Sequence, residues 1–170
     1  VRKLEIVMQQ AGVTPDICPA VRASLDKAQA TGAPAGAMVL PDGRVVTGKT
    51  SSLLGPSAAM LLNAVKLLAG IDKDLDLLPA SIIAPISDMK LRHLGHHNPR
   101  LHSDEVLIAL SISAVTNPLA ERVLKKLDDL RGSEAHFSVI LSEEDAKLYK
   151  RLGIHVSCEP RYEVKKLYHK

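Results

Sequence analysis

Two segments that read as helices with apolar side chains on almost every side constrain this chain most. They span residues 56–69 and 103–116, and the charged residues of the second are confined to its first turn. A helix that is apolar all round is stable only when neighbouring elements cover it on several sides. The chain therefore has to supply covering layers for both helices.

Short β-prone runs predict the sheet that these helices need. Residues 37–40 and 44–47 flank Pro41-Asp42-Gly43, and an Asp-Gly pair between two such runs favours a hairpin. Further strands are predicted over residues 81–84, 136–141 and 154–158. A hairpin followed by strands that helices connect predicts an α/β fold, a three-layer αβα domain with a mixed sheet of about five strands.

Helical patterns fill the rest of the chain. They are predicted over residues 2–10, 19–30, 85–94, 118–130 and 143–152. The first two assign residues 1–34 to an N-terminal helical segment that packs on the core or links to an upstream domain. Residues 35–170 then form the α/β domain. Because Val1 stands within the first helical pattern, we expect further sequence upstream.

Composition argues against several classes of partner. The chain has three Tyr, one Phe and no Trp, so it has few rings on which bases could stack. Its net charge is +3, which supports neither nucleic-acid nor membrane binding, although a local basic patch stays open. Cys18 and Cys158 lie too far apart in sequence to suggest a disulfide framework, and no apolar run approaches the roughly 18 residues of a membrane span. We expect a cytoplasmic protein, and homo-oligomer formation stays open.

Residues 43–50 match the phosphate-loop pattern, a Gly, any four residues and then Gly-Lys-Thr. That chemistry needs a loop whose backbone N–H groups curl around phosphates. The four middle residues are β-prone, and Gly43 belongs to the hairpin turn, so we predict a strand rather than a nucleotide loop. ATP binding through this stretch is not expected.

The connection that follows this strand is a candidate anion site. Lys49, Thr50, Ser51 and Ser52 bring one positive charge and several hydroxyls to the start of an apolar helix. The positive end of a helix dipole favours an anion, so these residues are candidate ligand-binding residues. The alternative is a polar connection whose hydroxyls cap the helix. Asn63, in mid-helix, either meets a buried backbone partner or faces a ligand.

Histidines gather between the two apolar helices, at positions 93, 96, 97 and 102. No acidic residue and no cysteine enters this segment, so metal ligation is not expected. His96 and His97, together with Lys49, are candidate catalytic residues that could exchange protons, and Asn98 is a candidate ligand contact. A solvated loop is the alternative.

Three stretches resemble the bacterial family called domain of unknown function 1846. They are Leu40–Ser52, Glu105–Ile112 and Arg131–His136. The resemblance implies that this chain is the carboxy-terminal domain of a much longer protein. Some members are labelled ATP-dependent peptidases, but no zinc pair of the His-Glu-x-x-His type and no nucleophile elbow supports that activity here.

The order of elements also resembles the cytidine-deaminase fold. That fold holds zinc at the starts of its two buried helices. Here these helices open with Pro56-Ser57-Ala58-Ala59 and with His102-Ser103-Asp104-Glu105, which lack the ligand set. We therefore expect no metal and no cofactor. The fold analogy implies a place for a ligand, at the mouth between the two helix starts.

Two hypotheses about function follow. In the first, the domain binds an anionic small molecule bearing phosphate or carboxylate between the two loops. Lys49 would then supply charge, Thr50 and Ser51 hydrogen bonds, and His96 or His97 a proton. In the second, the domain is a non-catalytic module that holds its parent protein together or forms an oligomer.

Overall fold

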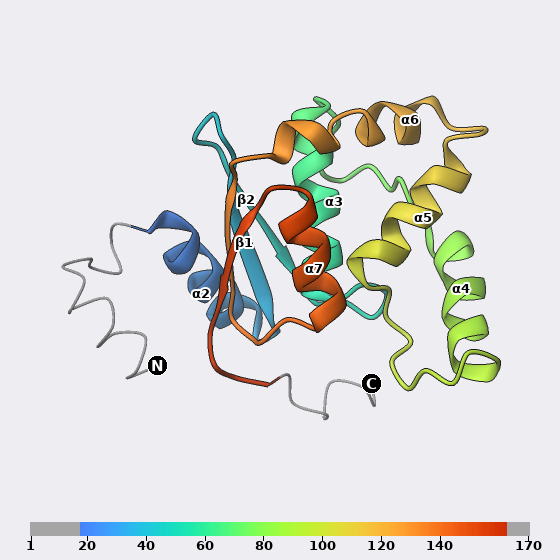
Figure 1. Cartoon of the computed structure of the whole chain (residues 1–170). Coiled ribbons are helices and arrows are strands. Elements are labelled where there is room, and N and C mark those ends of the chain that lie inside the picture. Colours follow the sequence, from blue (N-terminus) through green and yellow to red (C-terminus); the bar gives the residue numbers. More distant parts are fainter. Residues whose placement is uncertain (1–17, 163–170) are drawn as a thin grey trace.

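A mixed sheet organises the molecule, as the computed structural model of residues 18–162 shows (Figure 1). Its strand order is β2-β1-β3-β4. Strand β1 (Ala35–Val39) runs antiparallel to both β2 (Val45–Lys49) and β3 (Glu134–Phe137). Strand β4 (His155–Cys158) runs parallel to β3. The predicted helix over residues 2–10 lies outside the described residues.

The hairpin of β1 and β2 confirms the prediction from Asp42-Gly43. Gly43 has a φ of 87°, which favours glycine, and its N–H donates to the Leu40 carbonyl at 2.9 Å. Residues 45–49 are extended, so the stretch that matches the phosphate-loop pattern is a strand, as predicted. Asn63 donates from Nδ2 to the carbonyl of Thr47 at 2.9 Å, which identifies the backbone partner of this mid-helix amide.

Helices cover both faces of the sheet, which confirms the three-layer arrangement. Helix α2 (Pro19–Thr31) lies on one face, and α3 (Pro56–Leu68) and α7 (Glu143–Arg151) lie on the other. Phe137 of β3 meets Tyr149 of α7 edge to face, with ring centroids 5.6 Å apart. This aromatic pair ties α7 to the sheet.

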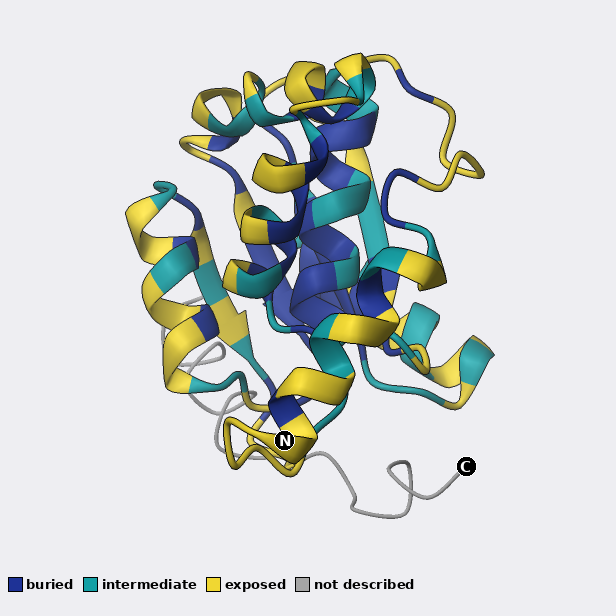
Figure 2. Ribbon diagram, turned by 90° about the vertical axis from the view of Figure 1, so that its right-hand side faces the viewer, coloured by how far each residue is buried: buried dark blue, intermediate teal, exposed yellow. Residues whose placement is uncertain are grey.

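Three further helices lie beyond α3 and α7. They are α4 (Ala80–Arg92), α5 (Ser103–Ser113) and α6 (Pro118–Leu124), and a short 3₁₀ turn (Leu127–Leu130) leads from α6 to β3. Helix α5 packs on α3, on α6 and on α7. Figure 2 shows the buried positions gathered along the central elements, with exposed positions on the outer turns of the helices.

Two of the predicted strands need correction. Residues 81–84 are the first turns of α4 and not a strand, so the sheet has four strands where about five were expected. Ile82, Ile83 and Ile86 all pack on the core, and their spacing is that of one helix face. The strand predicted over 136–141 is observed over Glu134–Phe137. Ser138 still donates its N–H to the Ala35 carbonyl at 2.9 Å, but its Oγ, in place of its carbonyl, accepts the N–H of Ala35.

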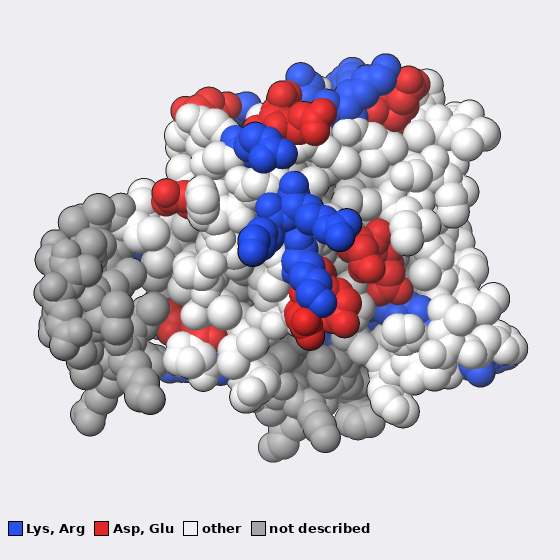
Figure 3. Space-filling view, in the orientation of Figure 1, with Lys and Arg blue, Asp and Glu red and all other residues white. Residues whose placement is uncertain are grey.

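The second apolar helix is α5. Among the described residues, other elements cover it on one side and leave its other side exposed. Ile108, Ile112 and Val115, on α5 and just after it, are 60%, 69% and 84% exposed. In Figure 3, Lys and Arg lie beside Asp and Glu over much of the face, whereas the area over α5 carries few charges. This exposed face of α5 favours the second hypothesis, that of a structural module.

Candidate functional site

A cavity of about 320 Å³ lies where the chain leaves the carboxyl end of β3. In open α/β sheets this end of the strands is where ligands bind. The cavity is lined by Gly55, Pro56, Ser57, Asn98, Leu101, His102, Val139, Ile140, Leu141, Ser142, Asp145 and Tyr162. These residues bring together the N-termini of three helices, α3, α5 and α7.

Backbone pairing holds the first two helix starts side by side. Leu54 forms a parallel bridge with Leu101, and the Leu101 N–H donates to the carbonyl of Leu53 at 3.0 Å. The N–H of Gly55 in turn donates to the Leu101 carbonyl at 3.2 Å. The third helix start follows β3, where Ser142 caps α7 by accepting the N–H of Asp145 at 3.2 Å.

Asp145 is the buried charge at the centre of this arrangement, with 5% of its surface exposed. Its carboxylate accepts the Ser57 hydroxyl at 2.6 Å and the Ser103 N–H at 3.0 Å, and it also accepts the Ser103 hydroxyl. Burial by itself would raise the pKa of Asp145. The neighbouring His102 ring and the hydrogen bonds from Ser103 and Ser57 outweigh that effect and hold this pKa well below its usual range.

His102 lines the cavity beside Asp145. Its Nδ1 lies 3.6 Å from the Asp145 carboxylate, and 31% of its side chain is exposed. The nearby Asp145 carboxylate raises the pKa of His102 above its usual value, although burial opposes the shift. The backbone N–H of His102 donates to Glu105 Oε1 at 3.0 Å, which fixes the residue at the start of α5. The site therefore favours an imidazolium that faces the cavity.

Tyr149 connects this site to the core. Its hydroxyl donates to the carbonyl of Ser57 at 2.7 Å, within the first turn of α3. Burial, and then the negative charge of Asp145, raise the pKa of Tyr149 well above its usual value. The phenol is therefore neutral, and its hydrogen bond links α7 to the first turn of α3.

Of the residues that the sequence singled out, Asn98 lines the cavity. Its Oδ1 accepts the N–H of Arg100 at 3.0 Å. The Nε of Arg100 donates in turn to the carbonyl of Ser51 at 2.5 Å. This contact joins Ser51 to Arg100, which lies two residues beyond Asn98.

The other predicted residues do not line this cavity. Lys49, Ser52, His96 and His97 are exposed, and Thr50 is buried with its N–H on the carbonyl of Pro34. Ser51 uses its hydroxyl to accept the N–H groups of the two residues that follow Ser52. Ligand contact by these side chains stays a prediction.

Sequence reasoning did not single out Ser57, His102 or Asp145 as site residues. Asp145 lies in the first turn of α7, and His102 is the N-cap residue of α5. The first-turn position of an acid and the helix-start position of a His were visible. No signal within one sequence indicated that the first turns of α3, α5 and α7 meet.

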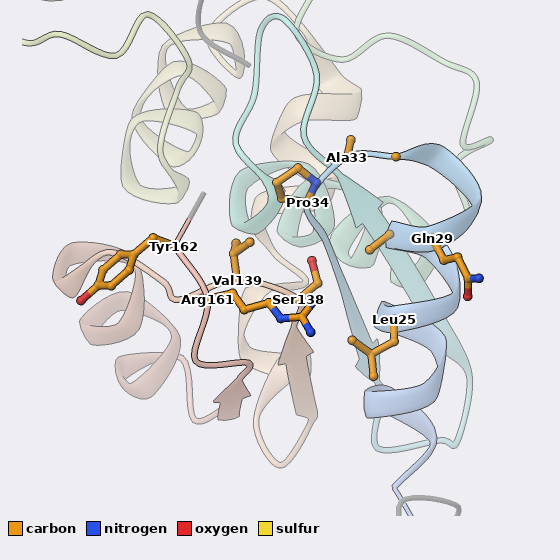
Figure 4. A pocket seen from close by; sticks show the side chains of 10 residues that line it. Leu25, Gln29, Ala33, Pro34, Ser138, Val139, Arg161 and Tyr162 are labelled. Atoms are coloured by element: carbon orange, nitrogen blue, oxygen red, sulfur yellow. The ribbon is translucent and has the colours of Figure 1, made fainter. Parts of the chain in front are cut away.

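A second cavity, of about 540 Å³, adjoins the first and shares Val139 and Tyr162 with it. Figure 4 shows Arg161 and Ser138 on one side of it and Leu25 and Gln29 of α2 on the other. Arg161 is the one charged residue among its described lining residues. Among its described lining residues, this second cavity has no buried titratable pair like the one that His102 and Asp145 form in the first cavity.

The described residues show neither a metal-binding cluster nor a membrane-spanning helix. Within residues 18–162, no group of three or more His, Cys, Asp or Glu residues is placed to hold a metal ion. No helix of that range is both long and apolar enough to cross a membrane.

Comparison with known proteins identifies the family. A family described as "Domain of unknown function DUF1846, C-terminal" matches residues 16–168. A UPF0371 protein of Streptococcus thermophilus is 49% identical over 170 residues, which are 100% of this chain and 34% of that protein. A UPF0371 protein of Streptococcus pyogenes matches with the same identity and coverage. The chain spans about a third of the length of these curated relatives. It belongs to the DUF1846 family, in which it corresponds to the C-terminal domain.

Proposed function

We propose that the cavity between the starts of α3, α5 and α7 binds a small molecule that bears a phosphate or carboxylate group. The observation that carries the proposal is His102, an imidazole paired with a buried carboxylate and facing a cavity at three helix N-termini. Each helix start contributes the positive end of its dipole, although the N–H groups of Ser103 and Asp145 are already accepted by Asp145 and Ser142. An anionic group is the ligand chemistry that these features favour.

Asp145 does not cancel this preference. Its oxygens already accept hydrogen bonds from Ser57 and Ser103, so its charge is largely satisfied within the protein. Its remaining effect is to favour the protonated form of His102. A ligand anion would then meet the outer face of the imidazolium, with Ser142 and Asn98 as neutral hydrogen-bonding groups on the cavity wall.

His102 is also the residue that we expect to exchange a proton with the ligand. A carboxylate behind an imidazole fixes the orientation of the ring and stabilises its charged form, which is how a general acid or base is positioned. The segment of Lys49, Thr50, Ser51 and Ser52 lies beside the Asn98 loop through the contact between Ser51 and Arg100. We include that segment as the proposed flank of the site.

Calorimetric titration with inorganic phosphate and with citrate, near pH 6, tests the proposal. We expect saturable binding to the unmodified chain and a loss of affinity of about tenfold or more in His102→Gln, because one charged hydrogen bond is removed. His97→Gln is the matched control, since that ring is exposed outside the cavity. Absence of saturable binding, or an equal loss in the control, would rule the proposal out.

A second candidate function is that of a structural module, and the exposed stripe on α5 favours it. Ile108, Ile112 and Val115 follow the spacing of one helix face. The relatives are about three times as long as the part that matches, since the match covers 34% of their length. We propose the remaining part of the full-length protein as the occupant of this face.

Thermal unfolding of the chain and of the full-length family protein separates the two functions. We expect Ile112→Asp to leave the isolated chain nearly unchanged, because that side chain is 69% exposed, and to lower the Tm of the full-length protein. Ala30→Asp, at an exposed position of α2, is the control. An equal effect in both proteins contradicts this occupant, and self-association of the isolated chain would assign the face to a second copy.

A further inference from the structure

A second cluster of reactive groups lies on the opposite face of the sheet, away from the cavity. His136 of β3 and Ser157 of β4 are paired in the parallel ladder, so their side chains lie next to each other. The His136 Nδ1 lies 2.6 Å from the Ser157 hydroxyl, and its Nε2 lies 3.3 Å from Glu159 Oε1. A hydroxyl, an imidazole and a carboxylate therefore stand in one line.

The chemistry of the carboxylate fixes the direction of these hydrogen bonds. An ionised Glu159 can only accept, so the proton of the imidazole belongs on Nε2. Nδ1 is then an acceptor, and the Ser157 hydroxyl has to donate to it. This is the order of a nucleophile, a base and a group that orients the base.

Burial makes this cluster costly if it serves stability alone. His136 is completely buried and Glu159 is 5% exposed, yet the second oxygen of Glu159, Oε2, is buried without a hydrogen-bond partner. Buried polar groups nearly always have partners, and an exception calls for an explanation. A carboxylate with one oxygen that has no hydrogen-bond partner can still stabilise a positive charge on the neighbouring imidazole.

Ser157, the residue at the other end of this hydrogen-bonded cluster, is at the protein surface. Ser157 is exposed on β4, which is an edge strand of the sheet. Burial, opposed by Glu159, lowers the pKa of His136 below its usual value, so the ring stays neutral and able to accept a proton at neutral pH. The cluster thus presents an exposed serine backed by a buried base.

We propose that Ser157 is an activated nucleophile that accepts an acyl group from an activated ester, with His136 as the general base and Glu159 as the residue that positions it. The Ser157 oxygen attacks the carbonyl carbon while its proton moves to His136 Nδ1. The bond from that carbon to the leaving oxygen then breaks, and the leaving group takes the proton from His136. The products are an ester on Ser157 and an alcohol, with no other reactant.

Labelling with a fluorophosphonate tests the nucleophile directly. Ser157 attacks phosphorus, the phosphorus–fluorine bond breaks, and the proton leaves with fluoride, so the adduct is stable and peptide mass spectrometry locates it. We expect Ser157 to be labelled on the order of 100-fold faster than the exposed Ser52, which lies outside the cluster. Equal rates at the two serines in the folded chain would overturn the proposal.

Two further measurements separate activation from a structural role. Nitrogen NMR of His136 should show the proton on Nε2, and a ring protonated on Nδ1 would contradict the direction of proton transfer. Glu159→Ala should slow labelling of Ser157 at least tenfold, the effect of one charged hydrogen bond, while Ser52 is labelled as before. If Ser157 is labelled at an unchanged rate in that variant, while circular dichroism shows an intact fold, then Glu159 does not position His136 as a base and the proposal is contradicted.

Discussion

The Nδ1 of His102 lies 3.6 Å from the carboxylate of Asp145, although the two residues belong to the starts of different helices, α5 and α7. The same carboxylate accepts a hydroxyl from Ser57 at the start of α3. One buried acid thus holds three helix N-termini around a cavity. The stability of the domain and the proposed ligand binding depend on the same group, so stability measurements and binding measurements both test the proposal.

Asp145→Asn should destabilise the domain by about 2 kcal/mol, because charged hydrogen bonds from Ser57 and Ser103 become neutral or are lost. Chemical denaturation measures the effect. Glu144→Gln, an exposed acid in the same helical turn, is the control and should change the free energy of unfolding by less than about 0.5 kcal/mol. Equal effects in the two variants would contradict the central place of Asp145.

The pH dependence of stability should carry the signature of both groups. The lowered pKa of Asp145 means that its contribution is present above the ordinary carboxyl value and is lost as pH falls through the folded value. The raised pKa of His102 means that its contribution is complete below the ordinary value of about 6.5 and is lost as pH rises through the higher folded value.

The His102 part can be isolated by comparing the chain with His102→Gln across a series of denaturation curves. The stability advantage of the unmodified chain should be larger near pH 5.5 than near pH 9, since the stabilising imidazolium is lost between them. His97→Gln should show no such trend. An advantage that grows toward alkaline pH would show that His102 is stabilised as the neutral ring.

Gly48→Ala should destabilise the domain by about 1–3 kcal/mol, the usual range for overpacking. A Cβ at Gly48 would lie 2.3 Å from the backbone nitrogen of Met60, where β2 meets α3. Gly55→Ala is the matched control, because a Cβ there meets only the Leu101 carbonyl oxygen, at 3.8 Å. Denaturation midpoints should fall for the first variant and stay nearly constant for the second.

Lys90→Met should loosen the loop that carries the histidines. Lys90 is 1% exposed, and its Nζ donates to Glu105 at 2.8 Å and to the carbonyl of Arg100 at 2.7 Å. Removing one partner of a buried pair costs about 3 kcal/mol, and amide exchange in residues 93–101 should accelerate. Lys147→Met breaks an exposed pair with Glu143 and should cost less than about 1 kcal/mol. Similar losses in both variants would contradict this role of Lys90.

The local part of the fold followed from the sequence. Asp42-Gly43 predicted the hairpin, and Ser142 predicted the start of α7, because both signals act within a few residues. The strand predicted at 81–84 was wrong, because Ile82, Ile83 and Ile86 pack on the core from one face of α4. Tertiary burial of one helix face decided that segment.

For the candidate site, the sequence predicted a place and not a chemistry, and ligand binding at that place stays a prediction. The mouth between the two apolar helices was predicted by analogy with another fold, and the cavity lies at those helix starts. Its chemistry did not follow, because Ser57, His102 and Asp145 meet through packing of three helices that are distant in the sequence. A single sequence contains no signal for such long-range contacts.

The most direct test of the central claim is the pKa of His102, followed by NMR in the absence and in the presence of inorganic phosphate. The account predicts a pKa above the usual histidine value without phosphate, and a further, saturable rise as the anion binds beside the imidazolium. A pKa at or below the usual value that does not respond to phosphate would contradict the proposed site.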